Sequence, residues 1–158
     1  MATPTKMLVR ALRKTALRLC SGARYEWGHL GSCNCGHLAQ TVTDFARGEI
    51  HAAAIRRKGD WSVVSREYCG TSGERIDAII GRMLEIGLSL EDIEFLEKLS
   101  SPAVLATLPS LRRNLRYNVR EDVVVYMRAW ADVLERQLSS PRETDAGAAS
   151  PGRRTEAA

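Results

Sequence analysis

The sequence predicts an all-α protein, an irregular compact bundle of about six to seven helices. Apolar residues recur at intervals of three and four through most of the chain, which is the spacing of one helix face. Glycine and proline divide these stretches into segments of helical length. The chain offers no convincing strand run, so a helical bundle is the expected fold.

The first helix is expected near residues 4–21. Pro4 suits a first helical position, and Gly22 offers a left-handed stop. The apolar residues between them follow at helical spacing: Leu8, Leu12, Ala16 and Leu19. Residues 22–34 then hold three glycines among mixed polar and aromatic neighbours, so they are expected to form a loop.

Three shorter helices are expected next. Asn34 is a favoured N-cap residue, and the apolar stripe that follows it ends near Gly48. Residues 49–58 contain an Ala-Ala-Ala-Ile run that favours a helix. Residues 61–68 form a further short helical segment before the Gly-Thr-Ser-Gly break.

Clear helix signals continue in the second half. Residues 75–86 carry the apolar stripe of a core-facing helix, and Gly87 ends it. Ser89, with Asp92 three residues later, is typical of an N-cap with an acidic third position. This signature predicts a helix that continues through Leu99, joined to the previous one by a tight turn.

The last two helices are bounded by proline and asparagine. A short apolar helix is expected over 103–108, between two prolines. Asn118 and Glu121 form another capping signature. Apolar residues then recur at helical spacing: Val119, Val123, Met127, Trp130, Leu134 and Leu138.

A single helical domain is therefore expected over residues 1–138. Residues 139–158 contain serine, proline, glycine, alanine and charges, a composition that predicts a disordered tail. The chain has 158 residues and 44% hydrophobic content, enough for one core. No apolar run approaches membrane-span length, and the N-terminus lacks the apolar core of a secretory signal, so a soluble cytoplasmic protein is expected.

The expected functional feature is a cluster of thiol and imidazole side chains between residues 29 and 37. His29, Cys33, Cys35 and His37 lie within nine residues. Thiolate and imidazole are the ligands that zinc and other transition metals prefer. The sequence therefore predicts a small soluble protein that binds a transition metal in a structural or partner-binding role. Zinc is the first candidate for that metal.

The spacing argues that this cluster is one part of a larger site. Only one residue separates Cys33 from Cys35, whereas structural zinc sites pair cysteines two to four residues apart. Four ligands in nine residues would strain the backbone. A distant donor is expected to complete the site, with Cys69 first and Cys20 or His51 behind it.

A second hypothesis is thiol catalysis at Cys35. A cysteine at a helix start faces free backbone N–H groups, which lower its pKa. The Asn-Cys-Gly sequence is similar to the nucleophile segment of several cysteine hydrolases, and the resemblance implies Cys35 as nucleophile with His29, His37 or His51 as base. A redox dithiol formed by Cys33 and Cys35 is a related alternative.

A third hypothesis is an interaction module based on the first helix, with structural cysteines. The basic residues before the first acid, Glu26, lie in and just after this helix and are Lys6, Arg10, Arg13, Lys14, Arg18 and Arg24. Such a helix can dock on an acidic surface, which suggests a protein partner. No nucleic-acid recognition motif accompanies it.

Overall fold

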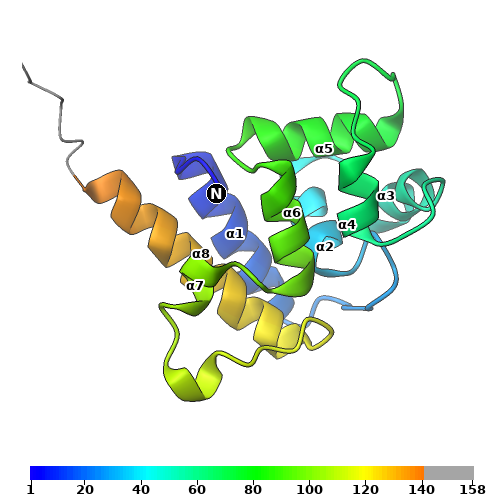
Figure 1. The fold of residues 1–158 in the computed structure, drawn as a ribbon. Helices are drawn as coiled ribbons and strands as arrows, with labels where there is room; N and C mark the ends of the chain where they lie inside the picture. Colours follow the sequence, from blue (N-terminus) through cyan, green and yellow to red (C-terminus); the bar gives the residue numbers. More distant parts are fainter. Residues whose placement is uncertain (141–158) are drawn as a thin grey trace, which may run out of the picture.

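The computed structural model describes residues 1–140 and confirms the all-α prediction for them (Figure 1). Within that range there are no strands, and no helix is both long and apolar enough to cross a membrane. The tail predicted for 139–158 lies outside the described residues from position 141 onward. The elements are α1 (Lys6–Cys20), α2 (Asn34–Val42), α3 (Arg47–Ala54), α4 (Trp61–Arg66), α5 (Arg75–Glu85), α6 (Leu90–Lys98), α7 (Pro102–Leu105), the 3-10 helix η1 (Ser110–Arg112) and α8 (Arg120–Ser139).

Helices α1 and α8 form one side of the bundle. They lie side by side in Figure 1, and their apolar faces meet in the core. Buried side chains at this contact include Leu8, Leu12, Met127, Trp130 and Leu134. At the solvent edge, Arg13 of α1 pairs with Asp132 and Glu135 of α8, at 3.0 and 2.6 Å. The two helices are therefore held together by an apolar contact in the core and by ion pairs at its edge.

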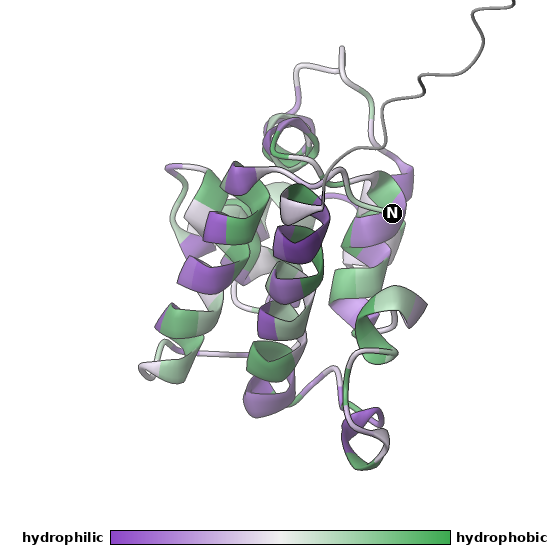
Figure 2. Ribbon diagram, turned by 90° about the vertical axis from the view of Figure 1, so that its left-hand side faces the viewer, coloured by the Kyte–Doolittle hydropathy of each residue, from purple (hydrophilic) through white to green (hydrophobic). Residues whose placement is uncertain are grey.

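Helix α2 lies at the centre of the fold. It contacts α1, α3, α5 and α6, and all its residues from Asn34 to Ala39 are buried. The helices in Figure 2 carry both hydrophobic and hydrophilic residues along their length, as expected for helices with one face in the core. The side chains of Cys33, Cys35 and His37, at the start of α2, are thus buried in the interior of the protein.

Some predicted helix starts are confirmed and others are wrong. Ser89 caps α6, and its hydroxyl accepts from the Asp92 N–H while the Asp92 carboxylate accepts from the Ser89 N–H. Asn34 is not a cap, because Cys33 occupies that position. Val119, not Asn118, precedes α8. The first helix begins at Lys6, capped by the Thr5 hydroxyl, two residues later than predicted.

Candidate functional site

Two glycines, Gly31 in the loop before α2 and Gly36 in α2, lie at close backbone contacts. A Cβ atom at Gly31 would lie 1.8 Å from the carbonyl oxygen of Arg47. A Cβ atom at Gly36 would lie 2.3 Å from the carbonyl oxygen of Leu30 and 2.5 Å from the carbonyl carbon of Gly31. Only glycine fits these positions without displacing backbone. The loop, α2 and α3 are therefore packed against one another at this point.

The thiols of Cys33 and Cys35 are fully buried in the core. The Cys33 thiol lies 3.7 Å from the carbonyl oxygen of Leu30, and the Cys35 thiol donates to the carbonyl of Ile93 at 3.3 Å. Burial raises the pKa of both thiols well above the usual range, and the negative charge of Glu97 raises it further. This direction is opposite to the one that a helix start alone predicts for Cys35, because desolvation outweighs the helix dipole.

His37 is an anchor between α2 and the preceding segments. Its Nδ1 lies 3.0 Å from the Arg18 guanidinium, and its Nε2 lies 3.0 Å from the carbonyl oxygen of Arg24. A guanidinium only donates and a carbonyl only accepts, so this geometry fixes the neutral ring with its proton on Nε2. Burial, with the nearby Arg18 charge, lowers the pKa of His37 to about 4. Both ring nitrogens are thus already engaged.

His29 and His51 stack on each other at the protein surface. Their ring centroids are 4.1 Å apart with an interplanar angle of 20°. His29 Nδ1 accepts from the Gly31 N–H at 3.2 Å, and His51 Nδ1 accepts from the Leu30 N–H at 3.0 Å. In its neutral form each ring therefore carries its proton on Nε2.

Cys69 lies in a different cluster, which is organised by a buried ion pair. Arg57 and Asp77 are joined by two hydrogen bonds of 2.8 and 2.6 Å, and Asp77 also accepts from the Cys69 N–H. The Cys69 thiol is exposed and lies 3.6 Å from the Thr71 hydroxyl, which lowers its pKa. Across residues 1–140, no three histidine, cysteine, aspartate or glutamate side chains are grouped to hold a metal ion. The five predicted ligands are not brought together as one set.

Glu97, which sequence reasoning did not select, is the acid that lies beside the two thiols. It is 2% exposed on α6, and its carboxylate accepts from the Cys35 N–H at 3.5 Å. Burial raises the pKa of Glu97 to about 7. A carboxyl group in this state exchanges its proton near neutral pH.

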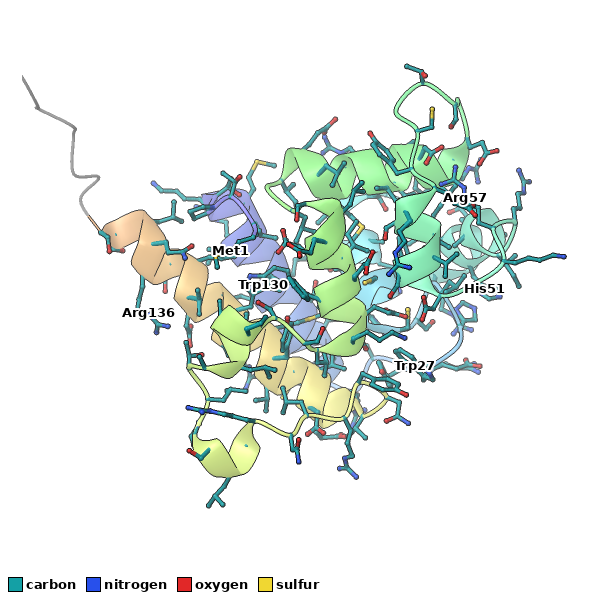
Figure 3. The ribbon with its side chains drawn as sticks, in the orientation of Figure 1. Met1, Trp27, His51, Arg57, Trp130 and Arg136 are labelled. Atoms are coloured by element: carbon teal, nitrogen blue, oxygen red, sulfur yellow. The ribbon has the colours of Figure 1, made fainter. Side chains whose placement is uncertain are left out.

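Glu97 lines an open cavity of about 410 Å³, here called the Glu97 cavity. The Lys98 ammonium lies at this cavity, 2.6 Å from Asp60 and 5.6 and 5.4 Å from the ring centroids of Trp27 and Tyr117. The two rings are 4.7 Å apart and tilted by 48°. Figure 3 shows Trp27 and His51, which also line it, on the same side of the molecule. The cavity is thus lined by the buried carboxyl group of Glu97 and by two aromatic rings that contact the Lys98 ammonium.

Asn34 connects the loop, α2 and α6 behind this cavity. Its amide nitrogen donates to the carbonyl oxygens of Glu97 at 2.9 Å, Tyr117 at 3.1 Å and Leu96 at 3.2 Å. Its amide oxygen accepts from the Tyr25 hydroxyl at 2.8 Å. Leu99, directly after α6, takes a left-handed φ of 51°. These contacts hold the end of α6, and hence Glu97, in a fixed position.

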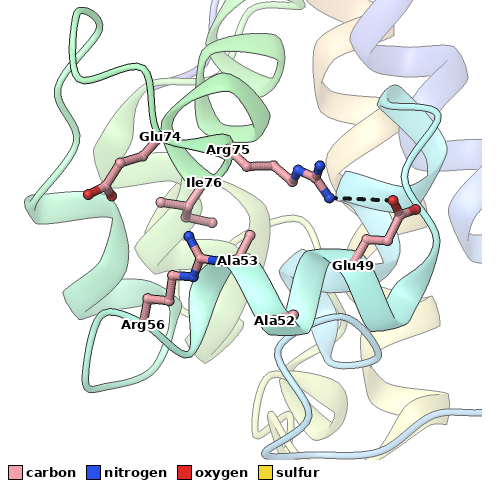
Figure 4. Close-up of a pocket in the computed structure, with 7 residues that line it drawn as sticks. All are labelled: Glu49, Ala52, Ala53, Arg56, Glu74, Arg75 and Ile76. Carbon is pink, nitrogen blue, oxygen red and sulfur yellow. Dashed lines mark hydrogen bonds and ion pairs between the residues drawn. The ribbon is translucent and has the colours of Figure 1, made fainter.

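A second hollow, of about 220 Å³, lies between α3 and α5 (Figure 4). Arg75 reaches Glu49 across it at 3.5 Å, and Glu74 pairs with Arg57 at 3.0 Å. Its charged side chains are largely exposed. Exposed pairs of this kind contribute little energy and leave no buried unpaired charge, so we assign the functional site to the Glu97 cavity instead.

The burial of the thiols gives a direct prediction for their reactivity. We expect iodoacetamide at neutral pH to alkylate the exposed Cys20 and Cys69 quickly, and Cys33 and Cys35 only when the protein unfolds. Peptide mass spectrometry of the native and urea-unfolded protein measures this difference. Rapid native alkylation of Cys35 would contradict the buried, protonated thiol and would instead support the thiol-enzyme hypothesis.

Comparison of the chain with protein-family models, with curated proteins and with solved structures found no match.

Proposed function

We propose that the protein binds a small organic amine in the Glu97 cavity, with the ammonium group at Glu97 and the apolar body along Trp27 and Tyr117. The observation that carries the proposal is Glu97 itself, a buried carboxyl group that lines an open cavity and has no salt-bridge partner within residues 1–140. Burying an unpaired acid is costly, and such groups cluster at binding and catalytic sites.

The cavity wall supports a cationic ligand. Asp60 and two aromatic rings lie around the Lys98 ammonium, so this wall already carries the kinds of group that contact a cation. A ligand amine would meet the ionised form of Glu97 in a desolvated setting, where a charged hydrogen bond is strong. We also propose a cytoplasmic setting, where reducing conditions would keep the four free thiols reduced.

Three matched probes test the charge that the cavity prefers. We expect benzylamine to shift the Trp27 indole resonance in two-dimensional NMR spectra, and neutral benzyl alcohol and anionic benzoate to shift it far less. Binding should be stronger at about pH 8 than at about pH 6, because Glu97 ionises between them. Glu97→Gln should weaken benzylamine binding by about tenfold or more.

The exposed Glu91 on the same helix provides the control, and Glu91→Gln should leave benzylamine binding unchanged. Equal shifts from all three probes would contradict a site for amines. So would benzylamine binding that is the same in wild type and in Glu97→Gln.

Zinc binding and thiol catalysis stay as predictions. A base for Cys35 would be Glu97 rather than His37, because both nitrogens of His37 are engaged. Elemental analysis of untagged protein tests the zinc hypothesis. Its candidate ligands are Cys33, Cys35, His29, His37 and Cys69. Less than about 0.2 metal per chain, unchanged by Cys33→Ser with Cys35→Ser, would rule it out.

A further inference from the structure

A second groove lies between α1, the end of α2 and α5. Its lining combines apolar side chains with basic ones. It has a volume of about 300 Å³, and we call it the α1–α5 groove. Its apolar lining comes from Met7, Ala11, Val42 and Ile86. Its charged lining consists of Arg10, Lys14 and Arg82 and includes no acidic residue.

Two of the three cations in the groove have no acidic partner in the described structure. Arg82 pairs with Glu85, one turn further along α5. Arg10 and Lys14 form no ion pair with any residue of the range 1–140, whereas Arg13, also on α1, is paired with α8. The groove therefore carries a local positive charge that an anionic partner would complement.

The shape of the groove favours a peptide over a membrane surface. The apolar face of α1 is already buried in the core through residues such as Leu8 and Leu12, so this helix cannot insert it into a bilayer. Met7, 58% exposed at the groove, is a flexible side chain of the kind that adapts to an apolar partner group. A concave floor accepts one projecting side chain, which a flat lipid surface does not provide.

We propose that the α1–α5 groove binds an acidic peptide segment of a partner protein. One bulky apolar side chain of that segment would fill the groove between Met7 and Ile86, and carboxylates on either side of it would pair with Arg10 and Lys14. This mode combines apolar burial for affinity with charge complementarity for orientation. The surface is separate from the Glu97 cavity, with which it shares no lining residue.

Selection from a random peptide library displayed on phage, with the full chain as target, tests the proposal. We expect the selected peptides to share one bulky apolar residue flanked by aspartate or glutamate. The binding of a synthesised selected peptide should weaken steeply as salt is raised. Arg10→Glu combined with Lys14→Glu should reduce its affinity by about a hundredfold, since both attractions become repulsions.

Two further variants separate groove binding from general charge attraction. Met7→Gln keeps the charge and changes an exposed side chain, and it should still weaken binding by about fivefold. Arg56→Glu with Arg112→Glu makes the same charge change outside the groove lining and should have little effect. Circular dichroism checks that each variant is folded.

Three results would overturn the proposal. The first is a selection that yields no acidic and apolar consensus. The second is equal loss of binding in both double variants, which would indicate attraction to net charge alone. The third is binding to phosphatidylcholine vesicles that contain phosphatidylserine, abolished by Arg10→Glu with Lys14→Glu, in the absence of peptide binding. That result would assign the surface to a membrane.

Discussion

Gly36→Ala is expected to destabilise the protein by roughly 3 kcal/mol or more, although alanine is the better helix former. Gly36 lies in α2, where glycine normally costs about 1 kcal/mol relative to alanine. Here the added Cβ atom would lie 2.3 Å from the Leu30 carbonyl oxygen and 2.5 Å from the Gly31 carbonyl carbon. Both are backbone atoms, so relief requires the loop or α2 to move. Urea denaturation followed by circular dichroism measures the loss.

Gly48→Ala is the matched control for this substitution. Gly48 lies in α3, and a Cβ atom there would have no heavy atom within 4 Å. The same chemical change is therefore expected to be neutral or to stabilise the protein by up to about 1 kcal/mol. Similar small effects at both positions would contradict the close packing of the loop against α2. Opposite signs would confirm that this packing, and not helix propensity, governs position 36.

The helices were predictable because their signals are local. The capping pair Ser89 and Asp92 bonds within one helical turn, so their spacing alone indicates the start of α6. Asn34 and Asn118 carry the same kind of signal, yet neither is a cap. The Asn34 amide instead binds three carbonyl oxygens from α6 and from Tyr117. A partner more than 60 residues away along the sequence is not encoded in local spacing.

The arrangement of the thiol and imidazole cluster could not be predicted for the same reason. Proximity in sequence grouped His37 with the cysteines, but its ring is directed to Arg18 and to the Arg24 carbonyl. His29 stacks on His51, which comes from α3. In an irregular loop, the direction of each side chain depends on which distant segment packs against it, and a spacing rule does not supply that information.

The position of Glu97 in the sequence does indicate that the residue is unusual. It lies four residues after Ile93 and directly after Leu96, which places it on the apolar stripe of α6. A charged residue at such a position either has a buried partner or faces a cavity. This pattern is sufficient to mark Glu97 as unusual. It does not reveal that the residue lies beside Cys33 and Cys35, because those contacts come from α2 and the preceding loop.

Glu97→Gln is expected to stabilise the protein by about 3 kcal/mol at pH values above about 7, and to have little effect at about pH 4.5. Glu97 has a pKa of about 7 in the folded protein, against an ordinary value of 4.5 in the unfolded chain. The folded state therefore favours the protonated acid. Stability is retained below pH 4.5, is lost progressively as the pH rises to about 7, and stays reduced above it. Glutamine removes this loss because it carries no charge to bury.

Urea denaturation of wild type and Glu97→Gln across this pH range measures the difference, and Glu91→Gln, at an exposed carboxylate of the same helix, is the matched control. A gain of the same size at all pH values would indicate better packing rather than removal of a buried charge. The prediction also connects stability to the proposed function. A residue whose replacement strengthens the fold while weakening benzylamine binding is retained at an energetic cost, which is the behaviour of a functional group. A loss of stability above pH 7 would instead make Glu97 a structural residue and would remove the main support for the amine site.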